Sequence, residues 1–342
     1  MKPPRKLAAA ISVAGLLAVA ACGGNAGATS SGGSGSSPVS VVGFSVLEQA
    51  NQQVISDFQK SPAGKGVSFT TSYGASGDQS RAVEAGLAAD EVHFSLEPDM
   101  TRLVDDGLVA KDWNTGPDHG ICTQSVVAFV VRPRNPKHIT GWDDLVKPGI
   151  RIVTPNPNSS GSARWNLLAA WGHVSANGGS EAQAKSYMQK FFTNVVSMPS
   201  SGRDATTAFQ SGTGDVLVSY ENEAILARQE GAKFDYLVPS DTLLIQNPCA
   251  VTKQAGSAAD AFLNFQHSLA GQTDYARTGF RPLDPSIHVS VKGANDPSNP
   301  FPQPQELLTI DKNFGGWASA TTKYFDENTG ILTKLQAAAG KS

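Results

Sequence analysis

A run of small, hydroxyl-bearing residues, Ser159–Ser162, is the part of this sequence best suited to binding chemistry. It follows an apolar, strand-like segment at 150–153 and precedes a helical pattern that we expect to end at Gly172. Serine adds a hydroxyl donor to the backbone N–H groups of such a loop. The first N–H groups of a helix lack intrahelical partners and carry the positive end of its dipole. The pattern therefore predicts a cradle for an anion, with an ordinary helix N-cap as the alternative.

Two further Ser/Gly turns lie between strand-like and helix-like segments, around Ser76 and around Gly202, and Ser45 ends the first apolar strand. In open α/β sheets, ligands bind beyond the carboxyl ends of the strands. We therefore expect these junctions to face one cleft and to offer an anion neutral donors instead of a Lys or Arg cluster. Hydrogen bonds to a charged group contribute about 1.5–3 kcal/mol each, so several of them predict micromolar affinity, about −8 kcal/mol, or tighter.

Motifs of other chemistry are missing from the sequence. It holds no G-x-S-x-G nucleophile elbow and no H-E-x-x-H zinc motif, and its six histidines are scattered. Glu221 and Glu223 could suggest acid–base catalysis, but glutamates in a first helical turn are more simply partners of the helix dipole. We expect neither an enzyme nor a bound metal or other cofactor.

Strand-like and helix-like segments alternate along the chain, which predicts an α/β fold with mainly parallel sheets. About 300 residues follow the leader, enough for two lobes with a core each. Predicted strands cover 40–45, 67–71, 92–96, 122–132, 150–153, 195–196, 216–219, 235–238, 243–245 and 249–251. Predicted helices cover 46–58, a segment ending at 89, 100–108, 142–145, a segment ending at 170, 182–192, a segment ending at 209, 221–230, 258–269 and 317–325.

The first 38 residues have the pattern of an export signal. A basic start and an apolar run at 7–21 precede Cys22, and the segment Val19–Gly23 resembles a bacterial lipobox. We expect a signal peptide at 1–21 and a lipid anchor on Cys22, with a plain secretory signal as the alternative. The Gly/Ser-rich residues 22–38 predict a flexible tether.

The remaining cysteines, Cys122 and Cys249, would lie in an oxidising compartment, where we predict a disulfide; two buried free thiols are the alternative. The chain carries 27 Lys and Arg against 30 Asp and Glu, a formal charge of −3. No basic patch with interleaved aromatic residues is present in the sequence, so we expect no nucleic-acid partner.

Several long motifs resemble the prokaryotic periplasmic sulfate-binding protein family. They occur in the family's order from about Val41 to Phe325, and they are Tyr73–Gly77, Thr154–Gly172, Gly214–Ala224, Gly279–Pro282 and Phe314–Trp317. The resemblance implies a two-lobed type II periplasmic solute-binding fold with a hinge between the lobes. It also implies closure over sulfate, with thiosulfate as a further ligand, and delivery to the permease and ATPase of an ABC importer.

The resemblance implies a lobe arrangement as well. Lobe 1 would comprise 39–120 and, after the chain returns, 250–306; lobe 2 would comprise 121–249, and 307–342 would form a C-terminal helical tail. Such folds cross between lobes near Cys122 and Cys249, so a disulfide there would tie the hinge. We expect a monomer anchored by its lipid to the extracytoplasmic face of the cell membrane.

In this family, neutral donors at helix starts hold the anion. Carried over by position, they are the Ser76 N–H, the Ser160 hydroxyl, the N–H groups of Gly161 and Ser162, and the Gly202 N–H. Arg164 matches a family arginine that supports the binding loop through backbone carbonyls.

Some positions depart from the family pattern. Ser162 replaces a common glycine, Tyr220 replaces an indole donor, and Ser45 stands where an aspartate is frequent. Asp204 replaces a small residue beside the Gly202 donor; we expect it to cap its helix and point outward. A donors-only site favours sulfate, because an unpaired acceptor facing sulfate is costly. The alternatives are phosphate, if Asp204 points inward, a larger oxyanion such as molybdate or tungstate, or a lipoprotein that engages a partner protein.

Overall fold

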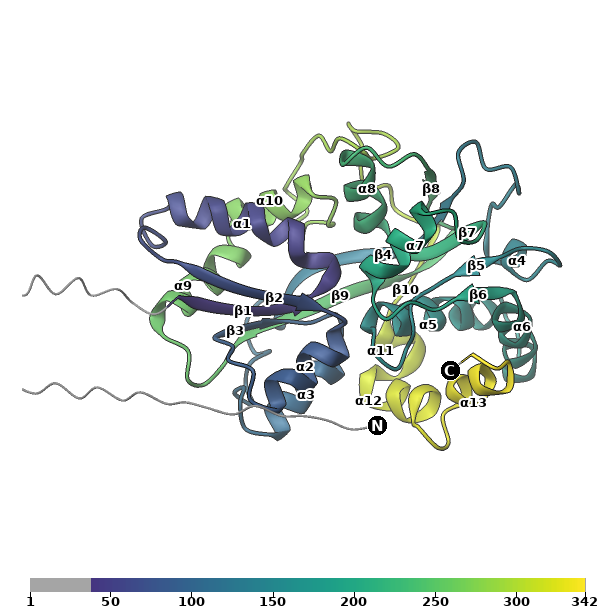
Figure 1. Ribbon diagram of the computed structural model, residues 1–342, viewed down its shortest axis with the longest axis horizontal. Coiled ribbons are helices and arrows are strands. Elements are labelled where there is room, and N and C mark those ends of the chain that lie inside the picture. The colour runs from purple at the N-terminus through teal and green to yellow at the C-terminus, as the bar shows by residue number, and fades with distance from the viewer. Residues whose placement is uncertain (1–37, 342) are drawn as a thin grey trace, which may run out of the picture. The chain divides into compact units, whose positions relative to one another are not determined.

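Two long antiparallel strands, β4 (Ile121–Val131) and β9 (Asp241–Val251), connect the two halves of the fold. The computed structural model describes residues 38–341. The sheet order β2-β1-β3-β9-β4-β7-β5-β6 places β4 and β9 at its centre, with β10 paired to β9 and β8 paired to β4. The chain passes to the second lobe along β4 and returns along β9, and it crosses once more in the segment 278–305 (Figure 1).

The first lobe is built on three parallel strands, β1, β2 and β3. Helices α1, α9 and α10 pack together, as do α2 and α3, and Figure 1 shows the two groups on opposite faces of the strands. The elements are β1 (Val39–Phe44), the short 3-10 helix η1 (Ser45–Leu47), α1 (Glu48–Lys60), β2 (Phe69–Gly74), α2 (Ser76–Glu84), β3 (Glu91–His93), α3 (Glu97–Asp105), α9 (Ser257–His267) and α10 (Leu269–Arg277).

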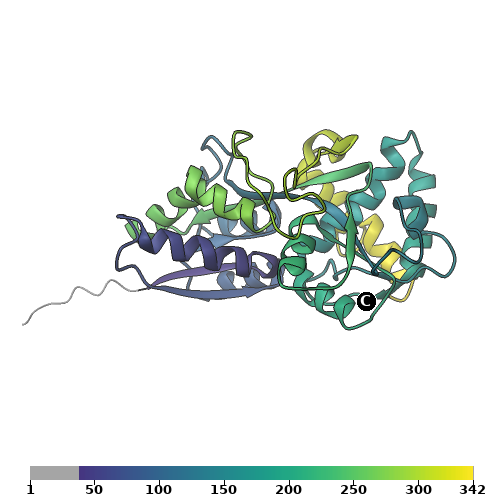
Figure 2. The same cartoon turned by 90° about the horizontal axis from the view of Figure 1, so that it is seen from above.

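The second lobe is built on β5, β6 and β7, in which β5 is parallel to both neighbours. The C-terminal helices extend this lobe, because α13 packs on α6, and Figure 2 shows the yellow C-terminal helices at the same end of the molecule as the teal ones. The helix α12 also contacts α3 of the first lobe. The elements are α4 (Trp142–Leu145), β5 (Ile152–Val153), α5 (Gly161–Ala176), α6 (Glu181–Asn194), β6 (Val195–Ser197), α7 (Gly202–Gln210), β7 (Val216–Tyr220), α8 (Glu221–Gln229), β8 (Asp235–Leu237), β10 (Glu306–Leu308), α11 (Ile310–Phe314), α12 (Gly316–Ala320), the π-helical segment η2 (Thr321–Phe325) and α13 (Ile331–Ala338).

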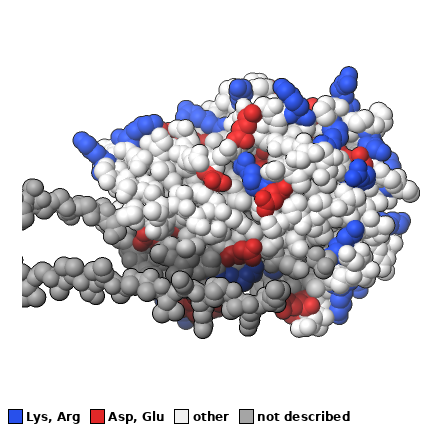
Figure 3. Space-filling view, viewed as in Figure 1, with Lys and Arg blue, Asp and Glu red and all other residues white. Residues whose placement is uncertain are grey.

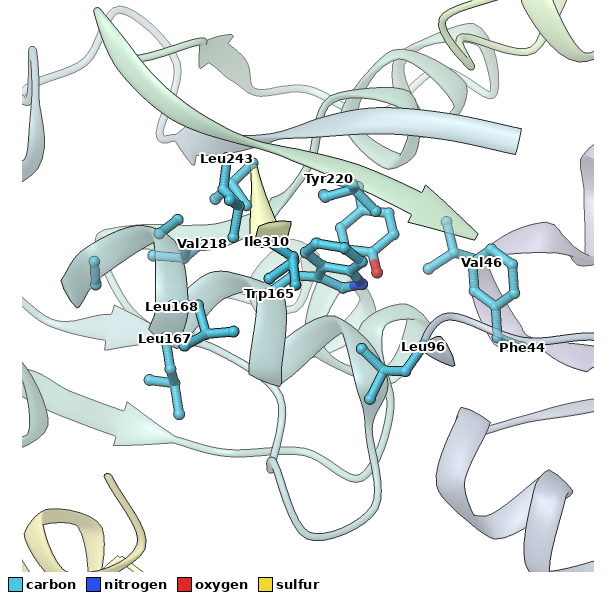
Figure 4. Close-up of a cluster of buried hydrophobic side chains, with 14 of the residues drawn as sticks. Phe44, Val46, Leu96, Trp165, Leu167, Leu168, Val218, Tyr220, Leu243 and Ile310 are labelled. Carbon is cyan, nitrogen blue, oxygen red and sulfur yellow. The ribbon is translucent and has the colours of Figure 1, made fainter. Parts of the chain in front are cut away.

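The helix α5 is apolar around most of its circumference and lies inside the core. Trp165, Leu167 and Leu168 are buried and pack with strand residues such as Val218 (Figure 4). Full burial of each large apolar side chain contributes about 1.5–3 kcal/mol. This packing fixes the start of α5, and with it the loop Ser159–Ser162.

Two sequence predictions about this region were wrong. The helix α5 does not end at Gly172 but continues to Ala176. A Cβ at Gly172 would lie 2.7 Å from Leu308 Cδ1, so the glycine permits close packing of the C-terminal segment on the helix. The predicted strands at 243–245 and 249–251 are one strand, β9, which continues through Pro248.

The sheet is also less parallel than expected. β4 is antiparallel to β7, β8 and β9, and β3 is antiparallel to β9. The sequence predicted no separate helix for α10 or α13: the helix expected at 258–269 runs past Ser268, which caps α10, and α13 lies in the segment expected only as a C-terminal helical tail.

The predicted disulfide is confirmed: Cys122 on β4 is bonded to Cys249 on β9, with their Cα atoms 5.7 Å apart. Both cysteines are buried. The expected signal peptide, lipid anchor at Cys22 and tether lie outside the described residues, apart from Pro38. No helix within residues 38–341 combines the length and the apolarity that crossing a membrane requires.

Candidate functional site

Four helices begin directly after extended backbone, and their starts define the candidate site. The residues before them, Ala75, Ser160, Ser201 and Tyr220, all have β-region dihedral angles. Only Ser201 caps its own helix, by accepting a hydrogen bond from the Asp204 N–H at 3.1 Å. At α2, α5 and α8 the residue before the helix provides no side-chain cap, and at α8 the Ser125 hydroxyl accepts the Asn222 N–H instead.

The main-chain donors at three of these starts are buried and unsatisfied by protein. Among residues 38–341, the N–H groups of Ser76, Gly161, Ser162 and Gly202 donate to no protein acceptor. All four residues are buried. Unpaired buried N–H groups are rare in folded proteins, and these four lie at the positive ends of helix dipoles. Together they form a local environment that favours an anion.

Close contacts bring the start of α5 against both lobes. The Gly77 N–H donates to the Ser159 carbonyl at 3.0 Å, which joins α2 to the loop before α5. A Cβ at Gly161 would lie 2.6 Å from Ser95 Oγ, and one at Gly202 would lie 2.8 Å from Ser162 Oγ. Glycine at both positions therefore lets the backbone of the helix starts approach neighbouring groups closely.

The serine hydroxyls differ in what they can offer a ligand. Ser76 Oγ donates to Asp99 Oδ2 at 2.6 Å and accepts the Ser95 N–H at 2.9 Å, so Ser76 can offer a ligand only its N–H. Ser160 Oγ and Ser162 Oγ lie 2.8 Å apart. One of their two protons forms this mutual bond, and the other remains available to an acceptor.

Tyr220 precedes α8 and is fully buried. Its phenol oxygen lies 2.7 Å from Ser95 Oγ, while Trp165 Nε1 donates to the Ser95 carbonyl at 2.8 Å; Figure 4 shows both polar atoms turned to the same side. Burial raises the pKa of the Tyr220 phenol, so the group stays protonated and can act as a donor.

The charged residues near the site are engaged elsewhere. Arg164 Nε donates to the Pro157 carbonyl at 3.1 Å, which braces the loop before α5. Asp204 is exposed, and its Oδ2 accepts hydrogen bonds from the Ser200 and Ser201 hydroxyls at 2.7 and 2.8 Å. The backbone nitrogen of Arg203 lies 3.5 Å from Ser45 Oγ, so Ser45 contacts the start of α7.

The two glutamates considered for acid–base chemistry form buried ion pairs. Glu221 contacts Arg281 through both carboxylate oxygens, at 2.7 and 3.1 Å. Glu223 Oε1 lies 3.2 Å from Arg203 Nε. Burial raises the pKa of both carboxyl groups, and the paired arginines oppose this shift.

Sequence reasoning missed Ser95, which contacts three of the site elements. Its signal was present: Ser95 is a hydroxyl-bearing residue two positions beyond the carboxyl end of β3, where ligands bind in α/β sheets. Asn247 was missed because it lies among apolar residues of β9; its Nδ2 donates to the Ser95 carbonyl at 3.1 Å.

Charge on the visible face of the described residues is mixed. In Figure 3, Lys and Arg side chains are interspersed with Asp and Glu over a largely uncharged surface. That face therefore presents no extended field of one sign.

Comparison with known proteins gives concordant results. A family described as bacterial extracellular solute-binding protein matches residues 39–281. The sulfate-binding protein of Synechococcus elongatus is 41% identical, covering 97% of this chain and 96% of that protein. The thiosulfate-binding protein of Pseudomonas aeruginosa is 35% identical, covering 84% and 89%.

A solved structure, the sulfate-binding protein SubI from Mycobacterium tuberculosis H37Rv, is 44% identical with a TM-score of 0.79, covering 85% of this chain and all of that one. These matches confirm the expected two-lobed type II periplasmic fold. The chain belongs to the periplasmic sulfate-binding proteins, within the bacterial extracellular solute-binding protein family.

Proposed function

We propose that this protein is an extracytoplasmic receptor that binds sulfate and delivers it to the permease and ATPase of an ABC importer. The observation that carries the proposal is the set of four buried, unpaired N–H groups at the starts of α2, α5 and α7. The relatives named sulfate-binding and thiosulfate-binding proteins support this assignment.

The proposed ligand shell is neutral. Ser76, Gly161, Ser162 and Gly202 supply N–H groups, and the Ser160 hydroxyl and the Tyr220 phenol supply O–H donors. Ser45 and Arg164 support the site from outside, the first beside the start of α7 and the second beneath the loop before α5. Closure of the lobes brings these donors around an anion that touches both lobes.

Selectivity for sulfate follows from the absence of a free acceptor. Hydrogen phosphate carries a proton that needs one, whereas sulfate does not near neutral pH. Among residues 38–341, Asp99 and Asp204 are bonded to serines beside the helix starts, and both carboxylates accept hydrogen bonds from those hydroxyls. A phosphate site is therefore disfavoured.

The cellular setting is part of the proposal. The family places the protein outside the cytoplasm, and we propose that Cys22 carries a lipid that anchors a monomer to the cell membrane. Residues 39–120 and 250–306 would form lobe 1, and 121–249 would form lobe 2, with 307–342 as a tail. Radiolabelled palmitate incorporation that persists in a Cys22→Ser variant would contradict the anchor.

The test of ligand identity is calorimetric titration of the purified protein with sulfate, thiosulfate, phosphate and molybdate at fixed ionic strength. We expect sulfate binding at micromolar affinity or tighter and no phosphate binding. Ser160→Ala should weaken sulfate binding about tenfold, through loss of a hydrogen bond to a charged group. The matched control is Ser175→Ala near the far end of α5, whose hydroxyl bonds only the Gly172 carbonyl.

Failure of every oxyanion to bind would contradict the receptor proposal. It would favour the second candidate, a lipoprotein that keeps the fold and engages a partner protein.

A further inference from the structure

We propose that Ser95 is a positioning residue of the anion site: its hydroxyl holds the Tyr220 phenol across the cleft and so directs one hydroxyl proton at the ligand. The inference rests on the proposed function and extends it to a residue that the family motifs do not include. It also explains how Tyr220 can act as a donor at a position where the family has an indole N–H.

Every polar atom of Ser95 is engaged. Its N–H donates to Ser76 Oγ at 2.9 Å, and its carbonyl accepts Trp165 Nε1 at 2.8 Å and Asn247 Nδ2 at 3.1 Å. Its hydroxyl lies 2.7 Å from the Tyr220 phenol. The residue is almost completely buried, at 1% exposure. Ser95 follows β3 in the first lobe, whereas Trp165 and Tyr220 belong to the second, so these two contacts join the lobes.

The number of hydroxyl protons on the Ser95–Tyr220 pair explains its proposed role. Two hydroxyls hold two protons, and their mutual hydrogen bond uses one. The second proton has to find another acceptor, because a buried donor without a partner is costly. Since burial keeps the phenol neutral, the pair always presents a donor and never a competing negative charge. A tyrosine paired in this way can replace an indole N–H.

The backbone of Ser95 is held from the hinge side. Thr123 Oγ1 on β4 donates to Asn247 Oδ1 at 3.1 Å, and the other end of that amide holds the Ser95 carbonyl. Because the Thr123 proton is committed, His93 Nε2, 3.1 Å away, must be the donor to Thr123 Oγ1. These hydrogen bonds connect the strands β4 and β9 to Ser95 and hold its backbone in place. The rotamer of the Ser95 side chain is the main freedom that this residue keeps.

The neighbouring glycine makes room for the hydroxyl. A Cβ at Gly161 would lie 2.6 Å from Ser95 Oγ. The hydroxyl therefore occupies the space that a larger residue at the start of α5 would fill, next to the unpaired Gly161 N–H. This places the Ser95–Tyr220 pair beside the proposed donors.

The experiment is a double-mutant cycle on sulfate affinity with Ser95→Ala and Tyr220→Phe. Calorimetry gives the Kd, stopped-flow tryptophan fluorescence gives the dissociation rate, and urea unfolding gives the stability of the ligand-free protein. We expect each single variant to weaken binding about three- to tenfold, mainly through faster dissociation. The double variant should lose no more than the larger single effect, because either change removes the same pair.

Thr252→Val is the control, since Thr252 is a buried residue whose hydroxyl donates to the Ala89 carbonyl at 2.8 Å and contacts neither member of the pair. It should leave the Kd unchanged. Wild-type affinity in Ser95→Ala, or losses that multiply in the double variant, would overturn the proposal; if Ser95→Ala fails to fold, wild-type affinity in Tyr220→Phe alone would do so. A wild-type protein that binds no sulfate overturns the proposed function itself, which separates the two failures.

Discussion

Replacing Gly161 with alanine should weaken sulfate binding without lowering the stability of the fold. Gly161 begins α5 with an ordinary helical backbone, so an alanine fits the main chain without strain. In the closed structure, however, its Cβ would lie 2.6 Å from Ser95 Oγ, 2.7 Å from Ser95 Cβ and 2.8 Å from Leu96 Cγ. All three atoms belong to the first lobe, and α5 belongs to the second. The substitution therefore opposes closure while leaving the Gly161 N–H in place.

The magnitude follows from the cost of overpacking. An extra methyl in a tightly packed region costs about 1–3 kcal/mol. Since about 1.4 kcal/mol corresponds to a tenfold change in Kd, sulfate affinity should fall about 5- to 150-fold. We expect the lobes to separate in the absence of ligand, and the methyl would then lose these contacts. Alanine also restricts the unfolded chain, so the free energy of unfolding should stay the same or rise by about 0.4–1 kcal/mol.

The assay pairs calorimetric titration with urea unfolding of the ligand-free protein. The matched control is Gly256→Ala: Gly256 precedes α9 as Gly161 begins α5, and a Cβ there meets no atom within 4 Å. Gly256→Ala should bind sulfate as the wild type does. Unchanged affinity in Gly161→Ala would refute the reasoning, because the contacts with Ser95 and Leu96 would then not be needed for binding. A parallel loss of stability would instead mean that the lobes stay closed without ligand.

Three further outcomes are expected. Replacing Cys122 and Cys249 together with serine should lower the free energy of unfolding by about 2–4 kcal/mol, measured with urea, because the bond closes a loop of 127 residues; an unchanged midpoint would contradict this. Burial raises the pKa of Glu91 to about 8 from 4.5, so the folded state binds more protons and stability should fall as pH rises from about 4.5 to about 8. Urea unfolding at several pH values tests this. Glu91→Gln should remove the fall of stability with pH, and its free energy of unfolding should equal that of the wild type near pH 4.5. Asp204→Asn should cost about 0.3–1 kcal/mol of stability and leave the sulfate Kd within twofold, whereas much tighter sulfate binding would show that the carboxylate faces the ligand.

The sequence predicted the local pattern of the site better than its assembly. The Ser/Gly junctions at Ser76, Ser160 and Gly202 were recognisable because helix starts have characteristic residues, and the structure places helix starts there. The disulfide was also predictable, because only two cysteines remain after Cys22. These features depend on short stretches of chain or on simple counting.

Features that depend on distant segments were not predictable. Gly172 looked like a helix end, yet its role is to leave room for the Leu308 side chain. Leu308 lies more than a hundred residues away in the sequence. Ser95 lies inside the predicted strand 92–96; its position and hydroxyl were visible in the sequence, but its partners Tyr220 and Asn247 come from other parts of the chain. Helix boundaries and single donors are therefore decided by tertiary packing that no local pattern encodes.

The bond between Cys122 and Cys249 makes the chain between them a covalent ring, and this ring contains β4 to β9 with all the helices α4 to α8. A protease that cuts once inside the ring leaves the backbone in two pieces that remain joined through sulfur. The nicked protein keeps its full mass until it is reduced. For a receptor outside the cell, where proteases are common and resynthesis requires export, a single cut in a surface loop of the ring would not release a fragment.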